Sequence, residues 1–185
     1  AFVLFMAGHG QSVAGRYYFA PVEFGAHTAL PGKGNSVAEQ QKIVDRMFST
    51  DGVSQDTLSE ALARIRAGKG IILLDTCYSA SLRVKDTDAN TGTQLNYSLG
   101  RPILAAAVGQ AIDGSETVKS GYFTRFLLEG LQGRADQNSN GKVDVMELAG
   151  FVMEEVEKAA KDEYDFEQQP TLTGTAIRRF DVATV

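Results

Sequence analysis

The sequence predicts an α/β domain built on a mostly parallel β-sheet with helices on both faces. Apolar segments alternate with segments whose apolar residues recur at helical spacing, an order typical of strand–helix–strand units. The expected strands 2–7, 71–75 and 102–108 consist of continuous apolar residues, apart from Asp75 at the end of the second, as expected for strands that are buried on both faces. Ligand sites of such sheets form at the carboxyl ends of the strands, so the residues that follow these runs are the first candidates for function.

Local signals define the other elements of the first half. The aromatic segment 16–22, bounded by Gly15 and Pro21, predicts a hairpin or an edge strand. Ser36 and Glu39 form a capping box, so a helix is expected to begin there. A turn is expected over 49–56. The apolar faces of the two expected helices are Ile43, Val44, Met47 and Phe48, then Leu58, Ala61, Leu62 and Ile65, with the second helix ending at Gly68 and Gly70.

The second half begins with a long polar stretch, 85–101, which has almost no apolar periodicity. After the apolar run 102–108, two amphipathic helices are expected. The segments 168–174 and 178–182 predict short terminal strands. The helix faces are Phe123, Phe126, Leu127 and Leu131, then Leu148, Phe151, Val152, Val156 and Ala159.

Length and composition indicate one globular domain over 1–185. The chain has 185 residues, 43% hydrophobic and 22% charged, enough to bury a substantial core. The net charge of −5 and the lack of a basic stripe argue against nucleic acid as a partner. Apolar runs stay well below the roughly 18 residues of a membrane span. A single cysteine excludes an intramolecular disulfide and favours a reducing compartment, here the cytoplasm.

Two strands deliver chemically active residues. His9 follows the first apolar run in FVLFMAGHG, and Cys77 follows the second in ILLDTCYSA. A thiol and an imidazole at neighbouring strand ends predict a cysteine nucleophile with a histidine base. The backbone N–H groups of Gly10 and Cys77 are candidate donors to an oxyanion, an effect of about 3–4 kcal/mol per donor.

Other interpretations of these residues exist. A lone cysteine is most often a small buried hydrophobic residue, and an exposed one can be a redox-sensing thiol. His27 lies in a Gly/Pro-rich loop and is the other candidate base. Asp75 precedes Cys77 by two residues and shares its face on a strand, so its carboxylate can select a substrate cation or cap the following helix.

The chain resembles the caspase-like cysteine peptidases, a group of hydrolases that includes caspases, metacaspases and bacterial orthocaspases. The matching segments run in the same order along most of the chain. They are FVLFMAGHG around His9, GRYYFAP after it, ILLDTCYSA around Cys77, then RPILAAAVGQAIDGSE, GYFTRFLLEGLQG and QQPTLTG.

The resemblance implies a three-layer caspase-like fold and a His9–Cys77 dyad that requires neither a third member nor a cofactor. An acidic residue at the position of Asp75 is typical of metacaspase-like members, which bind Arg or Lys there. Gln110 and Asp113 fall in a loop that helps to line the same pocket. The substrate would be a protein or peptide.

The resemblance also divides the chain into a large-half-like segment, 1–84, a linker, 85–101, and a small-half-like segment, 102–185. Candidate self-cleavage sites are Arg83, Lys85 and Arg101. The family domain begins with a strand, a helix and another strand before the histidine strand, whereas this chain enters that strand directly after Ala1. We therefore expect the N-terminal elements to be missing here and to come from a preceding segment of the same protein.

Residues 136–147 (DQNSNGKVDVME) match the calcium-loop pattern D-x-[DN]-x-[DN]-G-x5-E at every defined position. Gly141 is expected to make the sharp turn and Val143 to point inward. Similar Asp/Asn/Gly segments also occur as plain turns, so both interpretations stay open. The expected calcium ligands are Asp136, Asn138, Asn140, the carbonyl of Lys142, Asp144 and Glu147.

The sequence thus predicts a cysteine endopeptidase that cleaves after Arg or Lys through an acyl-enzyme. The alternative is an inactive caspase-like module that acts as a calcium-responsive interaction domain.

Overall fold

The computed structural model describes residues 1–27, 34–76, 101–106, 121–174 and 177–185. Its elements, in chain order, are β1 (Phe2–Gly8), β2 (Gly10–Val13), β3 (Arg16–Phe19), α1 (Val37–Asp51), β4 (Val53–Ser54), α2 (Gln55–Ala63), β5 (Gly70–Thr76), β6 (Ile103–Ala105), α4 (Tyr122–Glu129), the wider turn η2 (Gly130–Arg134), β7 (Lys142–Asp144), α5 (Val145–Tyr164), β8 (Thr171–Thr173) and β9 (Asp181–Thr184).

A mixed, mostly parallel sheet forms the centre of the molecule, in the order β1-β5-β6-β8. β5 pairs in parallel with β1 and β6, whereas β8 runs antiparallel to β6. The run Ile71–Leu74 is buried on both faces of the sheet, because β5 has a strand on each side and helices above and below. The predicted α/β architecture is confirmed.

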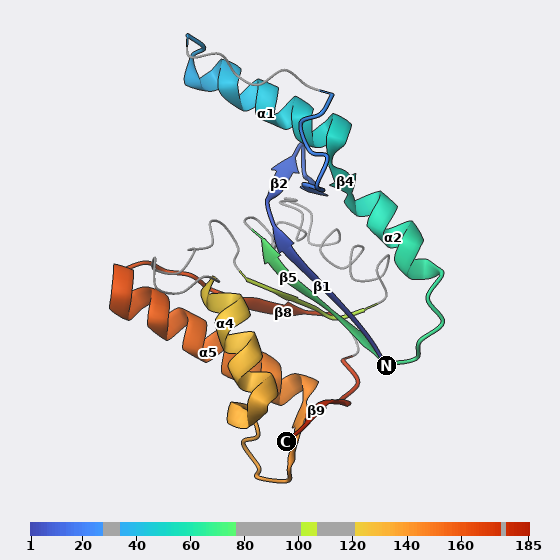
Figure 1. The fold of residues 1–185 in the computed structure, drawn as a ribbon, viewed down its shortest axis with the longest axis vertical. Helices are drawn as coiled ribbons and strands as arrows, with labels where there is room; N and C mark the ends of the chain where they lie inside the picture. The colour runs from blue at the N-terminus through green and yellow to red at the C-terminus, as the bar shows by residue number, and fades with distance from the viewer. Residues whose placement is uncertain (28–33, 77–100, 107–120, 175–176) are drawn as a thin grey trace.

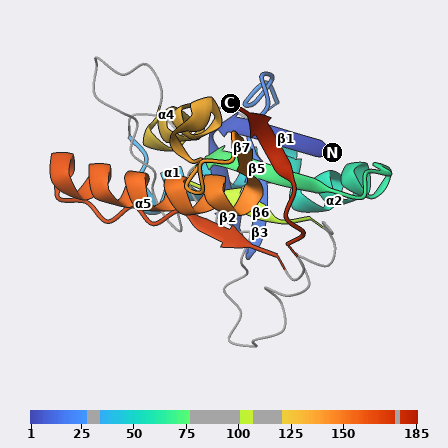
Figure 2. The same ribbon diagram turned by 90° about the horizontal axis from the view of Figure 1, so that it is seen from below.

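Helices pack on both faces of this sheet. α4 and α5 lie together on one face, where their aromatic and aliphatic residues pack on Ile71 and Leu73 (Figures 1 and 2). On the other face, Leu62 of α2 belongs to the cluster that includes Ile72 and Leu74. The edge strand β1 is covered on one side only, as the 44% exposure of its Phe5 shows. Within the described residues, cover on both faces therefore applies to the inner strands.

A smaller antiparallel unit, β2-β3-β4, lies with α1 beyond the carboxyl ends of β1 and β5 (Figure 1). β2 and β3 form the predicted hairpin, with Val13 opposite Arg16. The predicted capping box at the start of α1 is confirmed, because Ser36 and Glu39 exchange side-chain and backbone hydrogen bonds.

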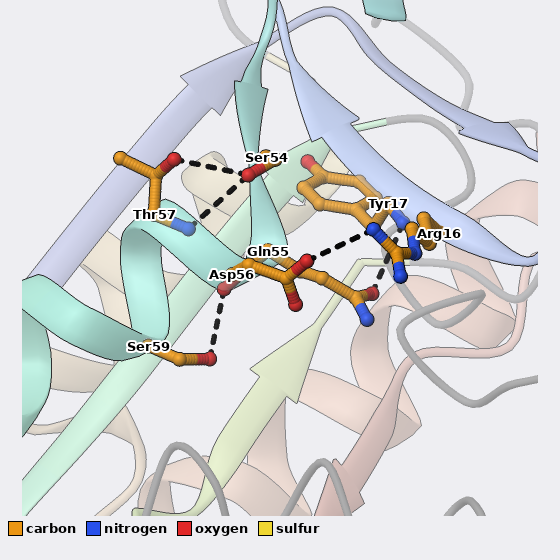
Figure 3. A network of polar contacts seen from close by, with 7 residues as sticks. All are labelled: Arg16, Tyr17, Ser54, Gln55, Asp56, Thr57 and Ser59. Carbon is orange, nitrogen blue, oxygen red and sulfur yellow. Dashed lines mark hydrogen bonds and ion pairs between the residues drawn. The ribbon is translucent and has the colours of Figure 1, made fainter.

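Polar contacts fasten this hairpin to the start of α2 (Figure 3). Arg16 pairs with Asp56 at 3.1 Å, and the backbone N–H of Tyr17 donates to Gln55 Oε1 at 3.1 Å. Ser54 caps α2 by accepting from the N–H of Thr57 at 3.1 Å. These contacts place β3 against the helix that packs under β5.

Two boundaries differ from the prediction. The expected turn 49–56 contains the last residues of α1, the short strand β4 and the start of α2, since Ser54 caps a helix at that point. α2 ends at Ala63, before Gly68 and Gly70, where the Arg64 N–H donates to Ala61 and Leu62 carbonyls.

Residues 85–100 of the predicted linker lie outside the described residues, so the division of the chain at that point stays a prediction.

Among the residues that the structure describes, no helix combines the length and the apolarity that crossing a bilayer requires.

Candidate active site

The carboxyl ends of β1 and β5 meet at one edge of the sheet. Their parallel register ends with Gly8 opposite Thr76. The next residue after Gly8 is His9, which is exposed, and the next residue after Thr76 is Cys77. The two candidate catalytic residues therefore follow the last paired positions of adjacent strands.

Gly8 allows the chain to leave β1 just before His9. Its φ of +146° is a conformation that residues with a side chain rarely adopt. A Cβ at this position would lie 3.4 Å from the ring of Phe19 on the neighbouring hairpin. The glycine is thus required by backbone conformation more than by lack of space.

Cys77 lies outside the described residues, and so do Gln110 and Asp113. Their predicted roles as nucleophile and as pocket lining stay predictions.

The amide of Gly10, a predicted oxyanion donor, is not used by the hairpin. Ala20 N donates to the His9 carbonyl at 2.9 Å, which makes Gly10 and Phe19 a pair without hydrogen bonds between them. The N–H of Gly10 consequently points away from β3. Its role as a donor to a substrate oxygen stays a prediction.

A buried hydrogen bond joins the hairpin that follows His9 to the strand that precedes Cys77. The hydroxyl oxygens of Tyr17 and Thr76 are 2.6 Å apart, with exposures of 0% and 2%. This contact was not predicted. Its sequence signal is weak, since only the alternation in Arg16–Phe19 indicates that Tyr17 points inward.

Asp75 is half-buried and lies on the face of β5 that α4 covers. Its Oδ2 accepts a hydrogen bond from the hydroxyl of Thr124. Thr124 is a second residue that the sequence analysis missed. The available signal was a threonine that follows two buried aromatic residues, Tyr122 and Phe123, in an amphipathic helix.

His27, the alternative base, is exposed and follows Gly25 in a turn. The backbone N–H groups of Gly25 and His27 both donate to Asp51 Oδ2, at 3.1 and 3.3 Å. This arrangement ties His27 to the end of α1 through its backbone. His9, by contrast, directly follows a strand that pairs with β5.

Arg101, a candidate self-cleavage site, is engaged elsewhere. Its guanidinium donates to the carbonyls of Ala67 and Ile65 at 2.8 and 2.9 Å. It also lies 5.4 Å from the centre of the Phe2 ring. Arg101 therefore links the loop after α2 to the starts of β1 and β6.

The predicted calcium loop, 136–147, comprises a tight turn after η2, the strand β7 and the first residues of α5. Both oxygens of Asp136 accept backbone N–H groups, from Asn140 at 3.1 Å and Gly141 at 2.9 Å. Gly141 has a φ of +76°, which supplies the predicted sharp turn. Val143 is fully buried, as predicted.

The carboxylates at the end of this loop cap α5. Asp144 Oδ1 accepts from the N–H groups of Met146 and Glu147, and Glu147 Oε2 accepts from the N–H of Asp144 at 2.9 Å. Arg179 pairs with Asp144 at 3.3 Å. The neighbouring Lys142 hydrogen-bonds Asp181, which raises the pKa of Lys142.

The loop offers oxygen donors, which suit calcium in chemistry. In the part of the chain that the structure describes, however, no three His, Cys, Asp or Glu side chains are grouped so that they could hold a metal ion. The acidic groups of the loop are satisfied by backbone amides, by Arg179 and by the side-chain amide of Asn138, which donates to Glu147 Oε1. Calcium would therefore have to replace some of these hydrogen bonds.

Comparison with known protein families shows which family the chain belongs to. The family model of peptidase C14, the caspase domain, matches residues 1–181. The comparison with curated proteins finds no match. The match includes both candidate catalytic residues and the whole central sheet. The chain belongs to the caspase-domain family of cysteine peptidases.

Proposed function

We propose that the chain is a cysteine endopeptidase of the metacaspase or orthocaspase branch, in which Cys77 is the nucleophile and His9 the base. The observation that carries the proposal is the parallel register, which ends with Gly8 opposite Thr76. Each of these residues is bonded to one member of the dyad, so two adjacent strand ends supply the thiol and the imidazole.

The reaction follows from ordinary thiol chemistry. The His9 imidazole takes the thiol proton, and the Cys77 sulfur attacks the carbonyl carbon of the scissile bond. The resulting oxyanion accepts hydrogen bonds from the Gly10 and Cys77 amides. The C–N bond then breaks as the imidazolium protonates the leaving amine. Water, deprotonated by His9, hydrolyses the thioester and restores the thiol.

Asp75 would select Arg or Lys at the position before the cut. The hydrogen bond from Thr124 holds one carboxylate oxygen, which limits the rotation of the side chain. A half-buried carboxylate attracts a cation more strongly than an exposed one does, because water screens it less. In this proposal Gln110 and Asp113 line the same pocket, and the reduced thiol fits a cytoplasmic location.

The test is cleavage of matched fluorogenic peptides that end in Arg, Lys or Asp before the reporter. We expect cleavage of the Arg and Lys peptides, loss of activity in Cys77→Ala and His9→Ala, and retention in His27→Ala. Asp75→Asn should lower kcat/KM for the Arg peptide by about 100-fold. This factor corresponds to about 3 kcal/mol, the cost of losing a charge partner that is partly shielded from water. Preference for the Asp peptide, or activity that survives Cys77→Ala, would overturn the proposal.

The second candidate is an inactive module that responds to calcium through the loop 136–147. It is favoured by the left-handed turn at Gly141 and by the oxygen donors of Asp136, Asn138, Asn140 and Glu147. Calorimetric titration with about 1 mM calcium tests it, with Glu147→Gln as the control variant. Calcium binding by a chain that cleaves no peptide supports the module. Absence of heat, in the presence or absence of peptidase activity, excludes it.

A further inference from the structure

A cavity of about 430 Å³ lies at the end of the sheet opposite His9. Its walls come from the loop before β5, the start of β6 and the segment before β9. Gly70, at the start of β5, pairs with Phe2, and Figure 1 shows this end of β1 and β5 beside the chain's N-terminus. His9 follows the opposite end of β1 in the chain. β5 has 7 residues, which separates the two ends by about 20 Å. The lining residues are Gly68, Lys69, Gly70, Arg101, Pro102, Arg178 and Phe180.

The cavity is positively charged in a protein of net charge −5. Lys69, Arg101 and Arg178 supply cationic groups, and the lining contains no Asp or Glu. Like charges around one hollow repel each other, and an anion placed between them relieves this repulsion. The charge pattern therefore selects anionic ligands.

Arg101 is held in place before any ligand arrives. Its two carbonyl partners and the Phe2 ring fix the guanidinium plane. A Cβ at Gly70 would lie 2.8 Å from Arg101 Nη1, so the glycine makes room for this side chain. Neutral carbonyl partners leave the positive charge of Arg101 uncompensated, and a fixed guanidinium loses little entropy on binding.

The other two cations are available as well. Within the described residues, the side chains of Lys69 and Arg178 form neither an ion pair nor a hydrogen bond, and both residues are exposed. The nearby cations behave differently, since Arg179 pairs with Asp144 and Lys142 with Asp181. The three cations that face the cavity thus have no acidic partner among the described residues.

We propose that this cavity binds a small molecule that carries two or more phosphate groups. Arginine forks bind phosphate oxygens in pairs, and lysine adds a point charge. The volume lies within the range of small-ligand pockets, and Pro102 and Phe180 provide an apolar wall for the rest of the ligand. Since Lys69 precedes residues 77–100 and Arg178 follows them, the ligand would bridge distant parts of the chain.

The test is calorimetric titration of the full chain with inorganic pyrophosphate, together with its melting temperature. We expect a Kd below about 1 mM and a rise in melting temperature, because only the folded chain has the cavity. The variant Lys69→Gln/Arg178→Gln should weaken binding at least about tenfold. The matched control is Lys42→Gln/Arg46→Gln, which removes the same charge from exposed positions of α1.

Unchanged pyrophosphate affinity in the control supports the proposal. An equal loss of affinity in the control would show a general charge effect and overturn it. No heat at about 1 mM pyrophosphate, or equally tight binding of the tricarboxylate citrate, would overturn the assignment to phosphate. These outcomes do not depend on peptidase activity.

Discussion

Removing the Tyr17 hydroxyl tests how the hairpin after His9 is joined to the strand before Cys77. In Tyr17→Phe, Thr76 Oγ1 loses the hydroxyl partner that lies 2.6 Å away. Thr76 itself is only 2% exposed, so water does not replace that partner. A buried polar group without a partner costs about 1–3 kcal/mol. We expect the free energy of unfolding to fall by that amount. Thr76→Val removes the other side of the same hydrogen bond and is the second single variant.

A double-mutant cycle gives the sharper measurement. In Tyr17→Phe/Thr76→Val both polar groups are gone, so the double variant should be nearly as stable as one single variant, with a coupling energy of about 1–2 kcal/mol. Urea unfolding measures all four proteins. The control is Tyr18→Phe, because the Tyr18 hydroxyl forms no hydrogen bond within the described residues and should be neutral.

The same variants test positioning. If the contact aligns the strand ends, Tyr17→Phe should lower kcat for the Arg peptide with little change in KM, and Tyr18→Phe should leave both unchanged. Additive losses of stability in the cycle, or single effects below about 0.5 kcal/mol, would refute the argument from burial.

Three further outcomes are expected. Gly8→Ala should destabilise the chain by about 1–3 kcal/mol in urea unfolding, because alanine is strained at a φ of +146°; an unchanged midpoint would contradict this. The hydrogen bonds from the Ser36 side chain and backbone lower the pKa of Glu39, so its contribution is present above the unfolded value of 4.5 and is lost as pH falls through the lower folded pKa. Glu39→Gln should therefore flatten the stability curve as pH falls below the unfolded value of 4.5, whereas an unchanged slope would count against the capping box. Self-cleavage should not follow Arg101, because its guanidinium is hydrogen-bonded to two carbonyls. Arg101→Ala should therefore keep the fragment pattern seen by mass spectrometry. Loss of a fragment in this variant would mean that Arg101 is released and that the chain is cut after it.

Local sequence signals predicted much of the fold. The continuous apolar run 71–74 predicted the central strand because both of its faces are buried. The capping box at Ser36 and Glu39 was predicted because its partners are only three residues apart. Helix ends were less well predicted, as α2 shows by ending at Ala63 without glycine. Helix ends depend on which carbonyls find donors, and that varies with the surroundings.

For the candidate site, the sequence by itself supplied the prediction of the chemistry. Strand periodicity and residue type are local properties, and they predicted His9, Cys77 and Asp75 at strand ends. Only the tertiary structure decided the register that sets Gly8 opposite Thr76, the Tyr17 and Thr124 contacts, and the gathering of Lys69, Arg101 and Arg178 around one cavity. These contacts join residues far apart in the chain. Their geometry depends on how the sheet and helices pack, which no local pattern encodes.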